Sequence, residues 1–260
     1  MVSFIVFLFG LVVGSFLNSV IYRLGKGESA LKGRSYCPQC KHPLSWQDLI
    51  PLLSFALLQG KCRYCKAHIS WQYPLVELAT GIVFVVLYNL VSLSFSQVFQ
   101  VPYFFAVASL LVVIFVYDLK HYLIPDKILY PAIGLVLAWR AFEILNLESW
   151  DLFRISNLGY SILPTLFFLA IFLVSRGTWM GFGDVKLALF MGLFLGWPNV
   201  LVALFVAFTL GAAVGVALIL LKKKGLRSQV PFGPFLIGGT FAALFFGEAI
   251  AHWYLDLLMV

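Results

Sequence analysis

The chain has 260 residues, of which 62% are hydrophobic, 17% are aromatic and only 11% are charged. This balance excludes a water-soluble globular protein, in which about a quarter of the residues are charged. The net charge of +7 does not indicate nucleic-acid binding, because basic loops that face anionic lipid account for it. We therefore expect a polytopic membrane protein that has the lipid bilayer, and no nucleic acid, as its partner.

A helix needs about 20 apolar residues to cross a bilayer, and such stretches recur along the chain. Eight spans are predicted, at residues 3–22, 74–93, 101–118, 127–145, 157–175, 184–197, 199–221 and 232–255. The sixth is short and could form one broken helix with the seventh, across Trp197, Pro198 and Asn199, which would leave seven spans. The predicted fold is all-α, with about eight transmembrane helices.

Lys and Arg residues indicate on which side of the membrane each loop lies, because cytoplasmic loops retain them. Of the 18 such residues, 16 fall on one side, in the loop 23–66 and in the turns between later spans. Only Arg140 and Arg154 fall toward the other side. The loop 23–66 is therefore predicted to be cytoplasmic, with both termini outside.

One polar segment, between the first two spans, contains all four cysteines. They form two C-x-x-C pairs, Cys37 with Cys40 and Cys62 with Cys65, separated by 21 residues. Each two-residue gap lets one turn direct both sulfurs at a single ion, and two such turns complete the tetrahedral shell of a structural zinc site. The segment is predicted to be a small zinc-binding loop domain that the metal helps to fold.

Other interpretations of the cysteines remain open. Two disulfides are possible in principle, but they rarely persist in a reducing cytoplasm. A redox pair would be expected beside a thioredoxin-like βαβ pattern, which is missing. His42 or His68 could replace one cysteine, although four thiolates already close the shell and leave no position for a reacting water.

Two aspartates near the predicted membrane boundaries are candidates for chemistry, because ionisable groups in such segments are costly and usually functional. Asp118 ends the third span and Asp184 opens the sixth, so the topology places both at the cytoplasmic level. Two facing carboxylates share one proton, because like charges about 3 Å apart resist ionising together. Such a pair supports aspartyl proteolysis: the ionised member takes a proton from water, and the protonated member donates to the peptide carbonyl.

These acidic residues also have simpler explanations. Asp184 follows Gly-x-Gly and precedes an apolar run, which is typical of a helix N-cap, and Asp118 could be a solvated turn residue. Asp126, after Pro125, is predicted to be an N-cap rather than a catalyst. Glu77, near the start of the second span, could serve a second activity or could simply be favoured there by the helix dipole.

The order and spacing of several motifs resemble the type IV prepilin peptidases of bacterial pilus and type II secretion systems. These motifs are Gly14-Ser15-Phe16-Leu17-Asn18, Ile21-Tyr22-Arg23-Leu24, both C-x-x-C pairs, Asp48-Leu49-Ile50-Pro51, Tyr73-Pro74-Leu75-Val76-Glu77, Asp118 with Asp126, Gly181-Phe182-Gly183-Asp184-Val185-Lys186-Leu187 and Pro231-Phe232-Gly233-Pro234. They extend over nearly the whole chain. Phe182 is a departure, since the family more often has Met or Tyr between the two glycines.

The resemblance implies an aspartyl protease that removes the short basic leader of prepilins or pseudopilins, with Asp118 and Asp184 as the catalytic pair. It also implies the bacterial cytoplasmic (inner) membrane, with the cysteine loop and the Asp pair at the cytoplasmic face. Gly181 and Gly183 are candidate substrate-binding residues, because a missing side chain lets the backbone approach an extended substrate strand.

The family also methylates the new N-terminal residue with S-adenosylmethionine, so the resemblance implies a second activity. The chain has no Gly-x-Gly-x-x-Gly unit between a strand and a helix, and this leaves the cofactor site unplaced. We expect it between the first two helices and the cysteine loop, with Glu77 as a candidate member.

A membrane transporter or channel is the alternative function, in which the same carboxylates relay ions. Two observations oppose it: the carboxylates lie at the inner edge rather than at the bilayer midplane, and no internal repeat is evident. Three domains are expected. They are a first transmembrane helix at 1–24, a cytoplasmic four-cysteine zinc domain at 25–73 and a transmembrane protease core at 74–260.

Overall fold

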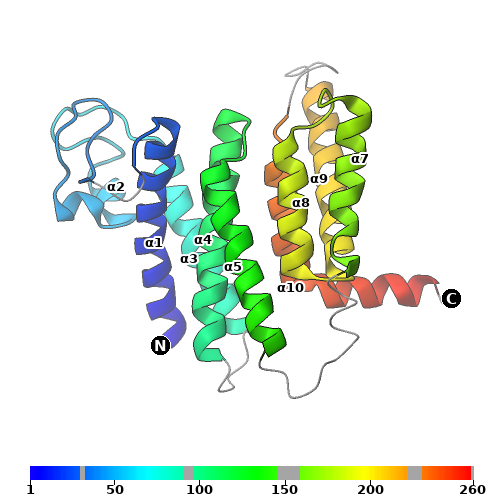
Figure 1. The fold of residues 1–260 in the computed structure, drawn as a ribbon. Coiled ribbons are helices and arrows are strands. Elements are labelled where there is room, and N and C mark those ends of the chain that lie inside the picture. The colour runs from blue at the N-terminus through cyan, green and yellow to red at the C-terminus, as the bar shows by residue number, and fades with distance from the viewer. Residues whose placement is uncertain (30–32, 91–96, 146–158, 222–229, 259–260) are drawn as a thin grey trace. The chain divides into compact units, whose positions relative to one another are not determined.

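The structure is a computed structural model that describes residues 1–29, 33–90, 97–145, 159–221 and 230–258. Within these ranges the regular elements are helices, accompanied by two isolated β-bridges. The prediction of an all-α fold is confirmed (Figure 1).

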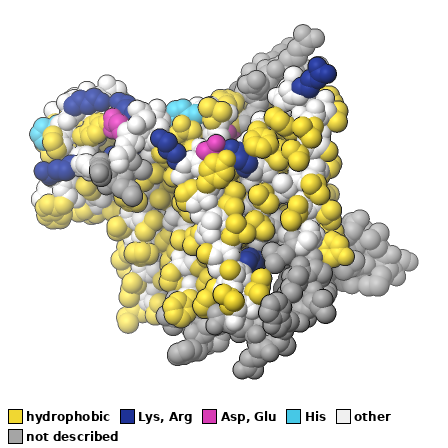
Figure 2. All heavy atoms as spheres, viewed as in Figure 1, with side chains coloured by type: hydrophobic (Ala, Val, Ile, Leu, Met, Phe, Trp, Pro, Cys, Tyr) yellow, Lys and Arg dark blue, Asp and Glu magenta, His cyan; other side chains and the backbone are white. Residues whose placement is uncertain are grey.

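Five of the described helices are long and apolar enough to cross a membrane: α1 (Val2–Gly25), α3 (Gln72–Leu90), α4 (Gln97–His121), α5 (Asp126–Leu145) and α9 (Asn199–Leu220). Three more apolar helices occupy the other predicted spans: α7 (Leu163–Ser175), α8 (Phe182–Leu195) and α10 (Gly233–Leu258). These helices agree with the prediction of about eight, although residues 91–93 and 157–158 of two predicted spans lie outside the described residues. Apolar side chains cover the sides of the helices on the face seen in Figure 2.

The chain forms two compact units, Met1–Val113 and Ile114–Val260. In the first unit α1 and α3 pack closely because glycines face the contact. A Cβ atom added to Gly10 would lie 2.7 Å from the Cα of Gly81, and one added to Gly14 would lie 2.7 Å from the Cα of Glu77. Small residues four apart allow this approach between membrane helices. The order of the contacts shows that α1 and α3 are antiparallel, so the loop between them begins and ends at one level.

Polar side chains of α1 hold the cysteine loop, which we define as residues 25–73. The side chain of Asn18 donates from Nδ2 to the carbonyl of Tyr73, at 3.0 Å. The guanidinium of Arg23 is buried and donates to the carbonyls of Gly33, at 2.9 Å, and Arg34, at 3.1 Å. These bonds satisfy polar groups that would otherwise be costly to bury, so they fix the start and the end of the loop on α1.

In the second unit α8 is the central helix, in contact with α5, α7, α9 and α10. Most of its side chains from Val185 to Phe194 are buried. At Gly192 the helix touches the backbone before α7, because a Cβ atom there would lie only 1.9 Å from the carbonyl oxygen of Ser161. From Leu187 to Leu195 the sequence of α8 is apolar on all sides, as expected for a helix surrounded by others.

This contact predicts a large loss of stability for Gly192→Ala. Overpacking costs about 1–3 kcal/mol, and a clash with a backbone carbonyl is not relieved by rotating a side chain, so we expect about 3 kcal/mol or more. Thermal unfolding of the purified protein in detergent measures it. The matched control is Gly215→Ala in α9, where an added Cβ meets nothing within 4 Å. Equal melting temperatures for the two variants would contradict the close contact.

Helices α8 and α9 run in opposite directions (Figure 1), so the alternative of one broken helix that forms a single span is wrong. α8 ends at Leu195, and Gly196 leaves the helix with a φ of 70°. Arg140 of α5 donates to the last carbonyls of α8, to Leu193 at 2.9 Å and to Phe194 at 3.1 Å. A cation at a helix C-terminus satisfies free carbonyls and interacts well with the helix dipole. This capping role explains a charged residue near the end of a membrane helix.

Candidate functional site

Asp118 and Asp184 line one cleft of about 810 Å³ in the second unit. Its walls come from the end of α4, the turn before α5, the loop after α7, the first turns of α8, and the segment that leads into α10. The lining residues are Asp118, Tyr122, Leu123, Ile124, Asp126, Phe168, Ile171, Gly177, Thr178, Trp179, Met180, Gly181, Phe182, Gly183, Asp184, Lys186, Phe208, Val230, Pro231 and Phe232. The predicted juxtaposition of the two aspartates is therefore present in the fold.

Asp118 lies near the end of α4, where its side chain is only 4% exposed. Its carboxylate accepts a hydrogen bond from the backbone N–H of Gly233, the first residue of α10. A Cβ atom at position 233 would lie 2.5 Å from Asp118 Oδ2, so only glycine brings this N–H so close to the carboxylate. The explanation of Asp118 as a solvated turn residue does not fit this burial.

Asp184 lies in the first turn of α8, which has Gly181 as its N-cap. Its carboxylate accepts the backbone N–H of Gly181, while its own N–H donates to the Gly181 carbonyl at 3.2 Å. Asp184 thus sits at the third helical position, in the arrangement of one half of a capping box, and not at the N-cap. Its charge and that of Asp118 repel each other across the cleft.

The two glycines before Asp184 have different surroundings, although both line the cleft. A Cβ atom at Gly183 would lie 3.1 Å from the side chain of Ile124, so this glycine packs against the turn between α4 and α5. At Gly181 the nearest atoms to an added Cβ are 3.9 Å away, and one of them belongs to Asp184. A role in substrate binding stays a prediction for both residues.

Asp126 and Lys186 form an ion pair at the same cleft. Asp126 is the first residue of α5, and the preceding Pro125 carbonyl accepts the N–H groups of Ile128 and Leu129. The predicted N-terminal position of Asp126 is therefore close to correct, but its main partner is Lys186, two residues after Asp184. This ion pair was not predicted, because nothing in the local sequence links α5 to α8.

The four cysteine sulfurs gather in the cysteine loop, all within 4.8 Å of one another. Cys37 Sγ and Cys65 Sγ are 3.9 Å apart, close to the separation of about 3.8 Å that Zn–S bonds of about 2.3 Å require in a tetrahedron. All four are free thiols, so the structure does not contain the alternative disulfides. Among the described residues, only these four sulfurs form such a group of potential ligands. They could hold one metal ion.

His42 and His68 do not belong to this group of ligands. The ring of His42 stacks on Tyr64, with centroids 3.7 Å apart, and its Nδ1 lies 2.8 Å from the Pro43 carbonyl. His68 lines a separate pocket. The set of candidate ligands is therefore cysteine alone.

The two C-x-x-C segments are copies of one turn. In the first, the N–H of Cys37 donates to His42 at 3.0 Å, and Lys41 has a φ of 60°. In the second, the N–H of Cys62 donates to Ala67 at 2.8 Å, and Lys66 has a φ of 59°. Each turn thereby directs two sulfurs the same way, which supports a shared ion.

The repeat extends beyond the cysteines. Residues 35–47 read SYCPQCKHPLSWQ and residues 60–72 read GKCRYCKAHISWQ, and each copy ends by starting a helix. These helices are η1 (Trp46–Leu49), a 3-10 helix, and α3. The expectation of no internal repeat is wrong for this loop, and the shared C-x-x-C-K and S-W-Q letters were the signal that could have revealed it.

Asp48 clamps the two copies together. Its carboxylate accepts Arg63 Nε at 2.7 Å and Tyr64 Oη at 3.1 Å, both from the second copy, and the Ser45 hydroxyl from the first. Burial favours the neutral carboxyl, but these donors outweigh it and hold the pKa of Asp48 below its ordinary value. Because the folded pKa is lowered, this contribution to stability is present at neutral pH and is lost only as the solution becomes strongly acidic.

The thiols compete for protons when no cation is present. Burial favours the neutral thiol of Cys37, but backbone N–H groups of Cys40 and Gln39 lower its pKa to about 7. The N–H of Ala67 favours the thiolate of Cys65, yet desolvation and the neighbouring sulfurs raise its pKa to about 11. A bound cation would remove this mutual repulsion of thiolates.

Glu77 on α3 is buried, at 7% exposure, and takes part in holding the cysteine loop. Its Oε2 accepts the backbone N–H of Leu52 at 2.9 Å, and the Ser15 hydroxyl of α1 also donates to it. Leu52 has a φ of 57°, which is costly for a residue other than glycine. The favourable interaction of Glu77 with the helix dipole does not by itself account for these specific contacts.

Comparison with known proteins gives matches over nearly the whole chain. Residues 8–91 match the bacterial Peptidase A24 N-terminal domain, and residues 105–216 match the type IV leader peptidase family. The prepilin leader peptidase/N-methyltransferase of Aeromonas salmonicida is 33% identical, over 98% of this chain and 94% of that protein. No solved structure matches the chain.

Two further relatives have the same name. The Pseudomonas aeruginosa protein is 33% identical over 96% of this chain and 92% of its own length. The Bacillus subtilis protein is 32% identical over 98% of both chains. The first domain match contains the four cysteines and the second contains both aspartates of the cleft, which agrees with the motifs quoted above. The chain therefore belongs to the type IV leader peptidase family.

Proposed function

We propose that the cleft around Asp118 and Asp184 is where this prepilin leader peptidase and N-methyltransferase cuts the leader from prepilins or pseudopilins. The observation that carries the assignment is that two carboxylates from separate helices share one cleft, each with a backbone N–H donor. The transporter or channel alternative is set aside, because the family is a peptidase family.

The chemistry follows from the pair. Two neighbouring carboxylates retain one proton between them, because a second negative charge is unfavourable so close to the first. The ionised carboxylate removes a proton from water as the water attacks the scissile carbonyl, and the protonated one donates to the carbonyl oxygen. The tetrahedral intermediate then collapses: the C–N bond breaks, the carboxyl that took the proton from water gives it to the leaving amine, and the other carboxylate takes back the hydroxyl proton. The N–H groups of Gly233 and Gly181 hold the two carboxylates in place for this exchange.

The loop before α8 is suited to hold an extended peptide. Gly181 is itself extended, with a φ of −76° and a ψ of 151°, and lies beside Asp184 at the edge of the cleft. A peptide bond can be cut only where the substrate has left its helix, and the exposed backbone groups then need partners. We propose that the backbone of Gly181 and Gly183 supplies them.

The test uses purified protein in detergent and a prepilin substrate. We expect mass spectrometry to show leader removal, and an added methyl group on the new N-terminus only when S-adenosylmethionine is supplied. An uncut prepilin, in a preparation whose folding is verified by a cooperative melting transition, would refute the assignment.

We propose that the four-cysteine cluster binds Zn²⁺ as a structural ion. The four thiol ligands, the sulfur separations and the paired turns all suit a closed tetrahedral shell, which leaves no position for a reacting water. Zinc would connect the two copies of the repeated turn, beside the clamp that Asp48 already makes. We propose three domains: a first helix at 1–24, the zinc domain at 25–73 and a protease core at 74–260.

We also propose an orientation for the protein in the bacterial inner membrane, with the cysteine loop and the Asp pair at the cytoplasmic face. The Lys and Arg distribution supports it. Arg140 lies on the predicted outer side, and its contacts agree with this position. It caps the C-terminal end of α8, whereas Asp184 lies in the first turn of that helix.

The S-adenosylmethionine site is proposed to lie in the first unit, beside Glu77. The cofactor needs acceptors for its ammonium and ribose hydroxyl groups. The carboxylate of Glu77 has lone pairs beyond those used by Leu52 and Ser15. Within the described residues, Gln72 Oε1 on the same helix is a buried acceptor without a partner. These two acceptors are the observations that support the proposal.

Glu77→Gln tests this site. The amide still accepts the N–H of Leu52 but lacks the charge, so we expect transfer of a labelled methyl group to a cleaved pilin to fall while leader cleavage continues. Glu77→Ala serves as the comparison, since it also removes the acceptor for Leu52 and should loosen the loop. Methyl transfer at the unmodified rate by Glu77→Gln would exclude Glu77 from the cofactor site.

A further inference from the structure

The cysteine loop exposes several large apolar side chains. They lie on η1, on α2 (Leu53–Leu57) and at the start of α3. We define this apolar face by its exposed members, which are Trp46, Leu53, Leu57, Trp71 and Leu75. Both tryptophans come from the Ser-Trp-Gln letters of the repeat and are 73% and 70% exposed. Soluble domains rarely expose so many large apolar groups together.

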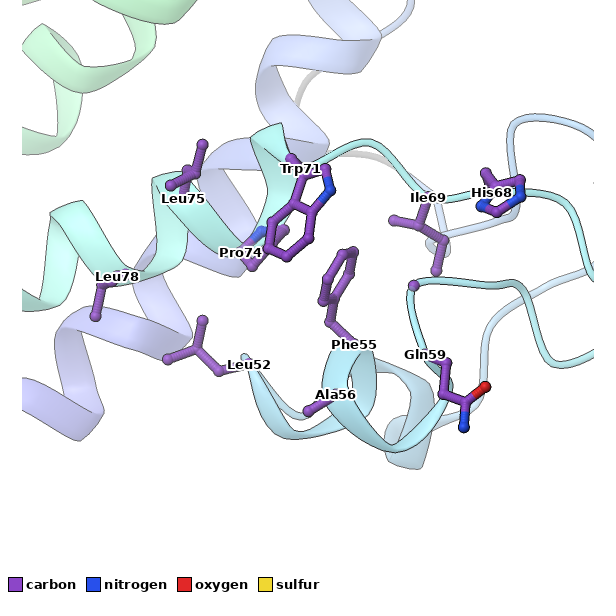
Figure 3. A pocket seen from close by; sticks show the side chains of 11 residues that line it. Leu52, Phe55, Ala56, Gln59, His68, Ile69, Trp71, Pro74, Leu75 and Leu78 are labelled. Atoms are coloured by element: carbon purple, nitrogen blue, oxygen red, sulfur yellow. The ribbon is translucent and has the colours of Figure 1, made fainter.

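A groove of about 560 Å³ lies between α2 and α3, and Trp71 and Leu75 of the apolar face line it (Figure 3). The rings of Phe55 and Trp71 approach to 5.0 Å at its centre. Leu75 and Leu78 extend the apolar wall along α3, whereas His68 and Gln59 lie at the opposite end (Figure 3). The groove is therefore apolar along the membrane helix and polar toward the cysteine turns.

The depth of the face in the membrane follows from its neighbours. Trp71 immediately precedes α3, which is long and apolar enough to cross the bilayer. Since α1 and α3 are antiparallel partners, the cysteine loop leaves and re-enters the helix pair at one level. Tryptophan prefers the boundary between lipid and water, so this level is where its side chain is most stable.

The charges near the groove favour anionic lipid. Lys61 and Lys66 are exposed on the second cysteine turn, and Lys61 pairs through a β-bridge with His68 at the polar end of the groove. Dark blue Lys and Arg side chains are visible on the lobe that the loop forms in Figure 2. Basic residues at the cytoplasmic surface attract anionic headgroups.

We propose that the apolar face of the cysteine loop lies in the lipid interface, with a phospholipid acyl chain in the groove and its anionic headgroup beside Lys61 and His68. The occupant is a lipid of the leaflet in which α1 ends and α3 begins. The loop is then anchored to the membrane surface as well as to its two helices. The proposal does not depend on which residues cut the substrate.

The experiment places the full chain in vesicles of phosphatidylcholine and phosphatidylglycerol, with or without bromine atoms in the upper part of the acyl chains. Subtracting the emission spectra of Trp46→Phe and Trp71→Phe from that of the unmodified protein isolates the fluorescence of each tryptophan. We expect brominated lipid to remove most of that fluorescence, and aqueous iodide to remove little. Quenching by iodide instead of bromine would overturn the proposal, and so would protection from both, which indicates a protein cover.

A second pair of variants tests the groove itself. Ala56→Leu adds volume inside it, because Ala56 lines the groove, and should reduce the quenching of Trp71 by brominated lipid. Ala79→Leu, on the same helix surface as Leu75 but outside the lining, is the matched control and should leave the quenching unchanged. Equal quenching in both variants would exclude an acyl chain from the groove.

Discussion

Asp118→Asn and Asp184→Asn are each expected to lower the rate of prepilin leader cleavage by about a thousandfold or more, because each removes one side of an acid–base exchange. An amide neither takes a proton from water nor donates the shared proton. Both variants should fold, since Asn has nearly the size of Asp and still accepts the N–H of Gly233 or Gly181. The measurement is single-turnover cleavage of a prepilin, followed by gel shift or mass spectrometry.

Asp126→Asn is the matched control for these two substitutions. Asp126 lines the same cleft, but its side chain is 52% exposed and its partner is a lysine, so its loss should cost less than about 1 kcal/mol of stability. We expect this variant to retain most of its cleavage activity. Normal cleavage by either Asn variant at 118 or 184 would falsify the assignment of the catalytic pair.

Removing the metal ligands is expected to have the second largest effect. Cys37→Ser with Cys62→Ser takes one sulfur from each copy of the repeated turn and should abolish metal binding. Structural zinc contributes roughly 10–16 kcal/mol of apparent binding free energy in small zinc domains, so we expect the cysteine loop to lose its protection from proteolysis. Metal analysis of the unmodified protein should give about one zinc per chain.

The helices of the second unit provide the internal control for this variant. They bury their own core around α8 and contain no described cysteine, so proteolysis should cut within 25–73 first. A zinc-free preparation whose cysteine loop resists protease as well as the metal-loaded protein does would contradict a structural ion. If metal analysis gives one ion per chain of a different metal, the metal site is supported but its assignment to zinc is wrong.

Much of the architecture could be predicted from the sequence, because it depends on neighbours along the chain. Apolar length predicts where helices cross a membrane, and the eight apolar helices occur where such stretches were found. The two C-x-x-C pairs could be predicted for the same reason, since one turn fixes both sulfurs of a pair. The repeat of residues 35–47 at 60–72 is equally visible in the sequence, because the two copies share the C-x-x-C-K and S-W-Q letters.

Some helix ends differ from the predicted ends, because they depend on signals that are weaker than the length of an apolar run. α7 begins at Leu163, with Pro164 in its first turn, where proline is favoured because the N–H that it lacks would have no partner there. α8 stops at Leu195 because Gly196 adopts a φ of 70° and Arg140 supplies a cap from another helix. Pro164 and Gly196 are signals that can be read from adjacent residues, whereas the cap from Arg140 cannot.

By itself, the sequence determined the class of protein, the eight apolar segments, the four candidate ligands and the two aspartates that deserve a test. Only the tertiary structure decided what surrounds them: the N–H of Gly233 on Asp118, the pairing of Asp126 with Lys186, and the contact of Glu77 with Leu52. The physical reason is distance along the chain. A helix or a cysteine turn forms from contacts within a few residues, whereas these partners meet only after the helices have packed.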